Sequence, residues 1–494
     1  MDIQQRQDKM KIEAKSYDFE HFLLHIASWF PVVLYKNNNQ ISKFPPTHRS
    51  MKVIHHETYQ DYRDGEWQQD YIDFDETKKF FEQFQNLWNI ATFPNLISFG
   101  WNTNADYGDA VRQSKNIYLS FGVIVDCENV MYSLTVKDGC SNIYNSCFVM
   151  ESCENIYESI GVAKSYNILY SHFVHNSANI WFSSNMIGCS ECLFCDNLQN
   201  TSYCIDNKVL DKEEYFKKKE DLLSQKTNFD LWKSNVSKKA QNIVSENASG
   251  NCIMESENIE NGQFVYHVSG GKNIMFAWTT DGNKDIYNTI SAGSPYGSDM
   301  YNCVSINGDN IYCSVHCGFW SNTYYSYYLN ECSYCIGCIW LMNKQFYIFN
   351  KQYTKEEWFI LADKIFEKMD QEGTLGKFFP GDICPFYIND TIGGMLLWAT
   401  KEQAENNGFL RREEKVNTDT VVHKNIVTID QLSWFESTEN GRAIDAKIAD
   451  CVIEDTEGNH YKILPLELAF LIKYQLPLPR KHRLDRMKEN FRLT

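Results

Sequence analysis

The chain has 494 residues, a formal net charge of −17 and an aromatic content of 15%. This length allows about three domains with substantial cores, and an acidic chain argues against broad nucleic-acid binding, which needs basic surface to neutralise phosphates. No apolar run is long enough for a membrane span. Segment 1–8 lacks the apolar core of a signal peptide, so we expect a cytoplasmic protein or part of a particle assembled in the cytoplasm.

The N-terminal residues 1–110 are expected to form an α+β domain. Phe80, Phe81, Phe84, Leu87 and Trp88 recur at helical spacing after Asp75. This pattern predicts a helix with one buried face.

Residues 111–208 repeat a short unit. An Asn recurs every 12 or 13 residues, and Cys192 takes its place in the last unit. Each Asn is followed by Ile or Val, then by an aromatic or large apolar residue, and four places later by Ser. Val or Met lies seven places after it, and Ser or Cys two places before it. The Asn positions are Asn116, Asn129, Asn142, Asn155, Asn167 and Asn179.

A unit this short cannot hold a helical hairpin, and its residues are strand and turn types. Stacked rungs of a β-solenoid explain the fixed columns, because each residue then lies over its equivalent. The repeated Asn fits such a stack, since Asn tolerates left-handed turns and its amides form ladders. A β-meander of hairpins is the alternative. One unit per coil is favoured over two, because Ser and Cys in the small column follow no odd–even rule.

A second ladder follows a helical linker and cap at residues 209–246. It occupies residues 247–352, with anchors that include Asn273, Asp285 and Asn322, and a capping helix is expected at 353–372. The two ladders end alike. Cys189-x-x-Cys192-x-x-Cys195 returns 143 residues later as Cys332-x-x-Cys335-x-x-Cys338, and each copy precedes a helix start of capping-box type, Asp211 with Glu214 and Thr354 with Glu357. The sequence thus predicts a mainly β protein with two tandem β-solenoids of 12–13-residue repeats, each capped by a helix, and flanking α+β domains.

A C-terminal α/β domain is expected at residues 373–494. A helix is predicted at 400–407, and strands at 420–428 and 447–453. From Arg480 onward the chain is basic. This tail could bind an acidic partner, a nucleic acid or the acidic body of the chain itself.

Several segments resemble a group of cysteine-rich repeat proteins of candidate-phyla (Patescibacteria) genomes, sometimes labelled caib/baif family. The matching segments are Asp73–Phe84, Gly376–Pro380, Leu464–Phe470, Leu476–His482 and the two that follow Asn207-Lys208 and Asn350-Lys351. The resemblance implies no activity. It implies zinc-ribbon Cys pairs near both ends, but this chain carries His55-His56 where the first pair is expected.

The 17 cysteines are the most conspicuous candidate chemistry. Without a secretory signal, reduced thiols are expected, and most of them fall at repeat positions where a small side chain packs well. The C-x-x-C-x-x-C spacing suits a metal, yet residues three apart on a strand face opposite sides. We therefore interpret these thiols as packing residues and expect no metal and no cofactor.

Other candidate catalytic groups are isolated. His172 and His175 have no fixed partner, and neighbours such as His316 and Cys317 point apart on a strand. Glu158 is the one carboxylate in the column three places after the Asn, so the sequence does not predict the paired carboxylates of a glycosidase. Two carboxylates in one cleft with perturbed pKa values would favour an enzyme.

The aromatic column suits binding if it faces outward; the alternative is that the aromatic stripes are buried against each other or against the linking helices. The candidate binding residues are Tyr144, Tyr157, Trp181, Tyr287, Tyr312 and Tyr324 of the column, and Arg480, Lys481 and Arg483 of the tail.

The predicted function is a structural or interaction scaffold that self-associates or binds a macromolecular partner through its repeat faces, alone or within a large assembly. Nucleic acid is expected to bind only through the C-terminal tail. A carbohydrate-active β-helix enzyme and a metal-binding regulatory protein are the alternatives, and the sequence favours a non-catalytic role.

Overall fold

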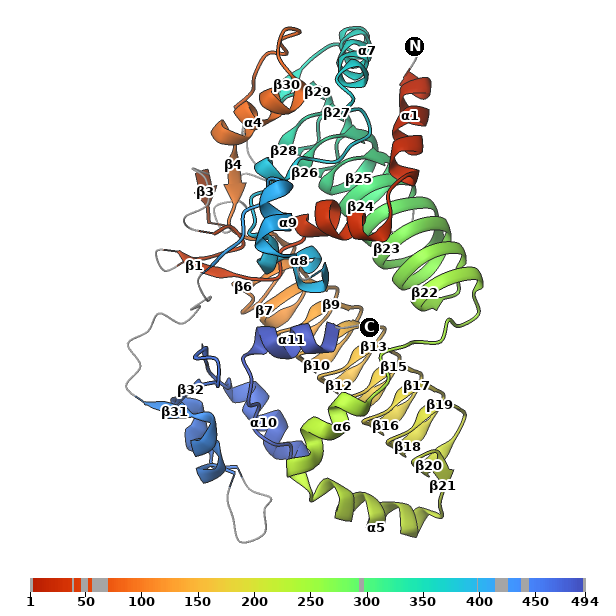
Figure 1. Cartoon of the computed structure of the whole chain (residues 1–494), viewed down its shortest axis with the longest axis vertical. Coiled ribbons are helices and arrows are strands. Elements are labelled where there is room, and N and C mark those ends of the chain that lie inside the picture. The colour runs from red at the N-terminus through yellow and green to blue at the C-terminus, as the bar shows by residue number, and fades with distance from the viewer. Residues whose placement is uncertain are drawn as a thin grey trace. The chain divides into compact units, whose positions relative to one another are not determined.

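The computed structural model describes residues 3–37, 40–45, 52–55, 70–292, 297–397, 399–413, 425–436 and 444–491. The chain is mainly β and contains a β-solenoid of about 19 turns between residues 107 and 348, flanked by helical regions (Figure 1). No helix among the described residues is long and apolar enough to cross a membrane.

The chain divides into two compact units. Unit 1 comprises Met1–Val33, Ser42–Leu96 and Gln241–Glu413, and therefore holds the second solenoid. Unit 2 comprises Leu34–Ile41, Ile97–Ala240 and Glu414–Thr494, and holds the first. The segments expected to form an N-terminal and a C-terminal domain are each divided between the two units.

The first solenoid forms one coil per repeat. Strands β8 to β20 alternate between two stacks of parallel strands. Paired residues in one stack are 13 positions apart at Ser141↔Glu154 and 12 positions apart at Tyr166↔Ala178. The expectation of one repeat per coil is thus confirmed. The strands are β5 (Ser98–Phe99), β6 (Tyr107–Arg112), β7 (Lys115–Ile124), β8 (Glu128–Met131), β9 (Leu134–Lys137), β10 (Ser141–Tyr144), β11 (Cys147–Met150), β12 (Glu154–Tyr157), β13 (Ile160–Ala163), β14 (Tyr166–Leu169), β15 (His172–His175), β16 (Ala178–Trp181), β17 (Ser184–Ile187), β18 (Ser190–Leu193), β19 (Asp196–Gln199) and β20 (Ser202–Ile205).

Each coil turns at four left-handed residues, three positions apart. In one 12-residue coil these are Asn167, Tyr170, Phe173 and Asn176, with φ between 49° and 56°. A 13-residue coil has two adjacent left-handed residues at its fourth corner, as at Glu151 and Ser152. A 13-residue repeat therefore differs from a 12-residue repeat by one extra residue at this corner, and the strands on either side keep their register.

One side chain on each side of the coil points inward. These are the Ile, Ser, Val and small columns of the repeat; the Ile, Val and Cys members form one continuous apolar core. The inward serines are bonded from coil to coil, because the Oγ of each accepts the backbone N–H of its equivalent in the next coil, as from Ser183 to Ser171 at 3.1 Å. Buried backbone N–H groups thus find acceptors inside an otherwise apolar interior.

The Asn column forms a ladder of side-chain hydrogen bonds at one corner, as expected. Each Nδ2 donates to the Oδ1 of the next Asn at 2.8–3.1 Å, from Asn104 through Asn179. The last donor bonds to Glu191 Oε1 at 2.7 Å. Glu191, and not Cys192, is therefore the residue in the Asn column.

Cys192 and Cys335 were expected in the Asn column, and this position is wrong by one residue. Cys192 pairs in register with Ile180, and Cys335 with Thr323, so both lie in the inward column that follows the Asn. In the second ladder, Asn273 also belongs to another corner, because its amide bonds to Asn288 and does not lie over Asp285.

Both solenoids end in the same cap. A short antiparallel strand closes the last coil, β21 (Lys208–Val209) against β20 and β30 (Lys351–Gln352) against β29 (Gln345–Ile348). A helix follows each one: α5 (Lys212–Leu223) begins at Asp211, whose side chain accepts the N–H of Glu214, and α7 (Lys355–Gln371) begins with a full capping box at Thr354 and Glu357. The predicted duplication of coil end and helix is confirmed.

Unit 1 wraps helices around the second solenoid. The solenoid strands are β22 (Glu246–Met254), β23 (Glu257–Ala292), β24 (Ser298–Tyr312), β25 (Val315–Tyr324), β26 (Tyr327–Asn330), β27 (Ser333–Ile336), β28 (Ile339–Met342) and β29. The helix predicted around Phe80 is α4 (Phe80–Ile90); four of its five predicted side chains are buried and Phe81 is half-buried. The other elements are α1 (Ile3–Lys15), α2 (Phe19–His21), η1 (Phe22–Ile26), η2 (Ala27–Trp29), β3 (Lys52–Ile54), β4 (Thr92–Pro94), η4 (Gly381–Ile383), η5 (Ile388–Asp390), α8 (Ile392–Leu397) and α9 (Lys401–Asn406).

Unit 2 adds two short helices after the first cap and a C-terminal segment. The predicted strand at 447–453 is half wrong, because Asp445 caps a 3₁₀ helix, η7 (Ala446–Asp450), before β32 (Val452–Glu454) begins. Of the strand predicted at 420–428, β31 (Ile426–Thr428) is described and residues 420–424 lie outside the described part. The other elements are β1 (Tyr35–Asn37), β2 (Gln40–Ser42), η3 (Lys226–Asn228), α6 (Phe229–Asn235), η6 (Ile429–Trp434), β33 (His460–Tyr461), α10 (Pro465–Tyr474) and α11 (Arg483–Phe491).

Candidate functional site

The aromatic column of the first solenoid is buried under α10. The ring of Phe470 lies 4.9 Å from that of Tyr144 and 5.6 Å from that of Tyr157, and Tyr474 lies 6.4 Å from Trp181. All three column side chains are at most 7% exposed. The column is therefore buried and presents no open stripe, but the helix whose rings cover it is the C-terminal α10 and not the expected linking helix.

The second solenoid has a stacked tyrosine ladder under α1. Rings of Tyr287, Tyr301, Tyr312 and Tyr324 follow one another at 5.2–5.4 Å and are tilted by 8° or less. Along α1, Lys15 lies over Tyr287 and Lys11 over Tyr301, and Gln7 donates to the hydroxyl of Tyr324 at 2.7 Å. The ladder spacing matches the 5.4 Å pitch of a helix, so Lys15 and Lys11 meet neighbouring rings, and Gln7, one turn further, reaches past Tyr312 to Tyr324. Tyr287 is half-buried and the others are buried.

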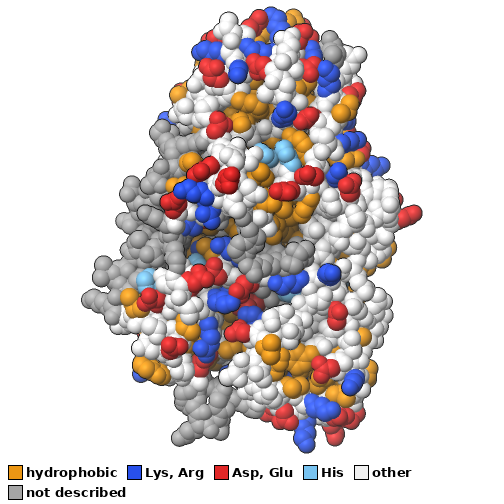
Figure 2. All heavy atoms as spheres, in the orientation of Figure 1, with side chains coloured by type: hydrophobic (Ala, Val, Ile, Leu, Met, Phe, Trp, Pro, Cys, Tyr) orange, Lys and Arg blue, Asp and Glu red, His pale blue; other side chains and the backbone are white. Residues whose placement is uncertain are grey.

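The three predicted tail cations contact their own unit. Arg480 pairs with Glu436 at 2.8 Å and Lys481 with Glu489 at 2.5 Å. Arg483 is buried with its guanidinium 5.6 Å from the ring centre of Tyr132. Figure 2 shows basic and acidic side chains intermixed over the C-terminal helices. The acidic partner of this tail is thus, at least in part, unit 2 itself.

A cavity of about 570 Å³ lies beside this tail, between the first solenoid, α6 and the segment that leads into α11. Aromatic residues of the coils and α6 form part of its lining, with six basic and four acidic side chains. The basic residues are Lys226, Lys233, Lys238, Arg480, Lys481 and Arg486, and the acidic ones are Glu158, Asp230, Glu436 and Glu489. We refer to this space as the basic cavity.

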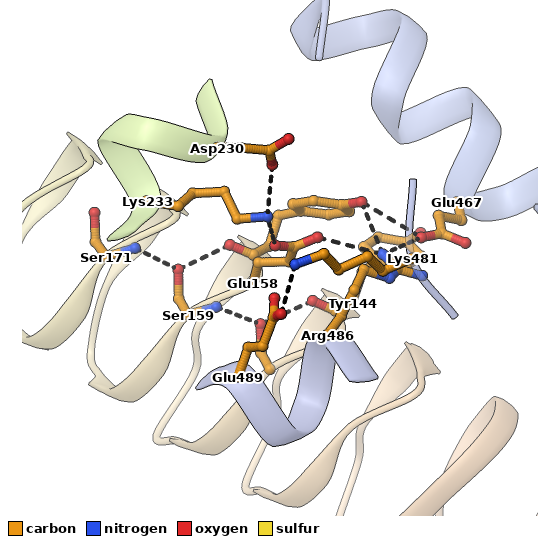
Figure 3. Close-up of polar contacts among 12 residues, drawn as sticks. Tyr144, Glu158, Ser159, Ser171, Asp230, Lys233, Glu467, Lys481, Arg486 and Glu489 are labelled. Carbon is orange, nitrogen blue, oxygen red and sulfur yellow. Dashed lines mark hydrogen bonds and ion pairs between the residues drawn. The ribbon is translucent and has the colours of Figure 1, made fainter. Parts of the chain in front are cut away.

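A buried ion cluster forms one wall of the basic cavity (Figure 3). Glu158 lies at a left-handed corner, 4% exposed, and its carboxylate meets Lys233 at 2.7 Å and Arg486 at 3.3 Å. The same guanidinium nitrogen of Arg486 reaches Glu467 at 3.2 Å and the hydroxyl of Tyr157 at 3.2 Å. The cluster therefore links a coil, α6, α10 and α11.

The two carboxylates of this cluster have opposite pKa shifts. Burial raises the pKa of Glu158, but the charges of Lys233 and Arg486 outweigh burial and hold it below its usual range. At Glu467, burial outweighs Arg486 and raises the pKa. Within the described residues, Oε2 of Glu467 and Nε of Arg486 have no hydrogen-bond partner.

This pair does not resemble the carboxylates of a glycosidase. Such enzymes keep a sugar between two carboxyl groups, whereas here a guanidinium lies between them and only Glu158 lines the cavity. The lowered pKa keeps Glu158 in its charged form between two cations, and Glu467 bonds to Arg486 behind it, away from the cavity lining. The cluster is therefore better suited to fixing α10 and α11 on the solenoid than to transferring protons.

The repeated cysteines face the coil interior. Left-handed Glu191 and Phe194 turn the chain between Cys189, Cys192 and Cys195, so thiols three apart point the same way, contrary to the expected alternation. Each thiol donates to the carbonyl two residues earlier, the bond that Ser171 makes in its own coil. Among the described residues, no group of three or more His, Cys, Asp or Glu could hold a metal ion.

The candidate histidines are also structural. His172 lies at the basic cavity with Nδ1 3.1 Å from the carbonyl of Ser237, and burial lowers its pKa to about 4. His175 is half-buried. His316 is a left-handed corner residue while Cys317 points into the core, so the two do not form a pair. His56 lies outside the described residues.

The first rung of the second solenoid, residues 243–250, is open. β22 is the terminal strand of its sheet and pairs with β23, preceded by a single bridge from Ile243 to Met254. Val244 is 82% exposed and has a left-handed φ of 47°. By contrast, the far end of the same solenoid carries the β30–α7 cap.

Comparisons of the chain with protein-family models, with curated proteins and with solved structures gave no match.

Proposed function

We propose that the chain is a self-associating structural scaffold whose copies join through the open first rung of the second solenoid. The observation that carries this proposal is the difference between the two ends of that solenoid: one has a cap and the other has none in the described part of its unit. An uncapped rung presents unpaired backbone N–H and C=O groups, a template for pairing with another chain.

The residues of the rung support this role. Val244 is an 82% exposed β-branched residue at a left-handed corner of the rung, the conformation that the corners of the other coils also adopt. Glu246 and Asn247 beside it are exposed as well. Two copies meeting rung to rung would form an isologous interface with antiparallel strands, and such two-fold contacts are the commonest kind in soluble oligomers.

Two further features favour a scaffold over an enzyme. The aromatic columns pack under the chain's own helices, which holds the rungs as a rigid body. The two buried carboxylates beside the basic cavity, Glu158 and Glu467, are paired with Arg486 and Lys233.

Light scattering coupled to size-exclusion chromatography tests the proposal. The wild-type chain should elute as a dimer with twice the 57.7 kDa mass of one chain, and Val244→Lys should return it to a monomer by placing like charges at the interface. The matched control is Leu231→Lys, at a 61% exposed apolar residue of α6, which should stay dimeric. A wild-type chain that is monomeric at every soluble concentration would refute the proposal.

A further inference from the structure

We propose that the basic cavity of unit 2 binds a small organic anion, a molecule with an apolar or aromatic body and a phosphate or carboxylate group. This site is separate from the open rung and independent of self-association. Five observations support it: the charge of the lining, the exposed rim ion pairs, the unpartnered Nε of Arg486, the aromatic part of the lining and the volume.

The charge of the lining is reversed relative to the chain. The whole chain has a net charge of −17, yet six of the ten charged side chains that line the cavity are basic. A recess lined mainly by one sign of charge concentrates ligands of the opposite sign. The local excess of cations therefore favours an anion.

Four of the six cations fall into two kinds. Lys233 and Arg486 are engaged with the buried Glu158 and form a fixed wall. Arg480 and Lys481 lie at the rim, and their side chains are 42% and 56% exposed in their pairs with Glu436 and Glu489. Exposed ion pairs contribute little to stability, so these two cations can exchange their carboxylate partners for an anionic ligand without loss of the fold.

One group in the fixed wall also has an unused donor. Arg486 is 4% exposed and lines the cavity, and its Nε has no hydrogen-bond partner among the described residues. A buried donor without a partner is unfavourable. An anionic or hydroxyl oxygen of a ligand that reached this nitrogen would remove that deficit.

Part of the lining is aromatic. Tyr157, Tyr170 and Phe229 line the cavity, and the rings of the last two meet edge to face at 5.9 Å. The volume of about 570 Å³ falls within the range of about 300–1,000 Å³ typical of ligand sites. It greatly exceeds one inorganic ion, so the ligand has an organic body against the rings and its charge toward Arg480 and Lys481.

Isothermal titration of the full-length chain with three probes tests this assignment. Phenyl phosphate and benzoate carry the two candidate anions on the same ring, and phenol has the ring without either group. We expect one or both anions to bind with an affinity that falls as salt rises, and phenol to bind more weakly. The stronger of the two anions identifies the charged group of the natural ligand.

The variant is the double substitution Arg480→Gln and Lys481→Gln, which leaves the fixed wall intact. It should weaken anion binding by at least about tenfold, the scale of a lost charge-assisted hydrogen bond. Lys401→Gln is the control, since Lys401 is an exposed, paired lysine of unit 1 and its loss should change nothing. The double variant should keep the oligomeric mass of the wild type, which separates this result from the test of self-association.

Three results would overturn the assignment. These are no heat with either anion, equal binding of phenol and the anions, and equal losses in the double variant and Lys401→Gln.

Discussion

Removing one hydroxyl from the inward serine column should destabilise unit 2 through a backbone group in the next coil. Ser171 is fully buried; its Oγ accepts the N–H of Ser183 at 3.1 Å and donates to the carbonyls of Leu169 at 2.9 Å and Ile180 at 3.3 Å. In Ser171→Ala the N–H of Ser183 faces the apolar interior without an acceptor. An unsatisfied buried donor costs about 1–3 kcal/mol.

The assay is thermal unfolding followed by circular dichroism, together with hydrogen exchange at the amide of Ser183. Each kcal/mol should lower the melting temperature of a unit of this size by about 2–4 °C, and the Ser183 amide should lose protection. Ser202→Ala is the matched control, because Ser202 is exposed on the same solenoid, and an exposed substitution should change stability by about 0.5 kcal/mol or less.

A second substitution separates polarity from shape. Ser171→Cys keeps a donor and a weak acceptor, as at Cys195, whose N–H bonds to Ser183 and whose thiol bonds to the carbonyl of Leu193. It should lose less stability than Ser171→Ala. Unchanged melting and unchanged Ser183 exchange in Ser171→Ala would refute the account of the serine column.

Two further predictions concern the C-terminal segment of unit 2 and its response to acid. Phe470→Ala should cost about 3–5 kcal/mol, since the ring is buried against Tyr144 and Tyr157, while Ile472→Ala, 43% exposed on the same helix, should cost little; equal effects on melting would show that α10 is not held by its aromatic contacts. Burial lowers the pKa of His172 to about 4 and that of His482 to about 3 from an ordinary value of 6.5. The unfolded chain therefore takes up protons first, and the melting temperature should fall as the pH drops from 6.5 toward 4; a flat profile, or the same slope in His172→Asn, would contradict this assignment.

The repeat architecture could be predicted from the sequence because it depends on contacts between residues that are close in sequence. Every coil reuses the same contacts between residues 12 or 13 apart, so the columns of Asn, Ile, Ser and Val are visible without knowledge of the fold. The same holds for the caps, since Thr354 and Glu357, three residues apart, are sufficient to predict the start of a helix.

The basic cavity could not be predicted in this way. Glu158, Lys233, Glu467 and Arg486 come from a coil, a linking helix and two C-terminal helices, and no periodicity connects them. Two weak signals existed. Glu158 was the one carboxylate in its column, and Arg480 and Lys481 belonged to a basic tail on an acidic chain. What the sequence did not supply was that this tail returns to the coil that carries Glu158.

The phase error at the cysteines shows where column reading fails. The last Asn of the ladder is replaced by Glu191, which keeps the hydrogen bond of the column but not its residue type. Because the column was followed by residue type alone, Cys192 was assigned to the corner, although it lies one place later in the inward column. The correction matters chemically, because three inward thiols separated by left-handed corners face one interior, where they make the hydrogen bonds of serine. Their repetition in the second solenoid is then explained by the packing of two equivalent coil ends, with no ligand required.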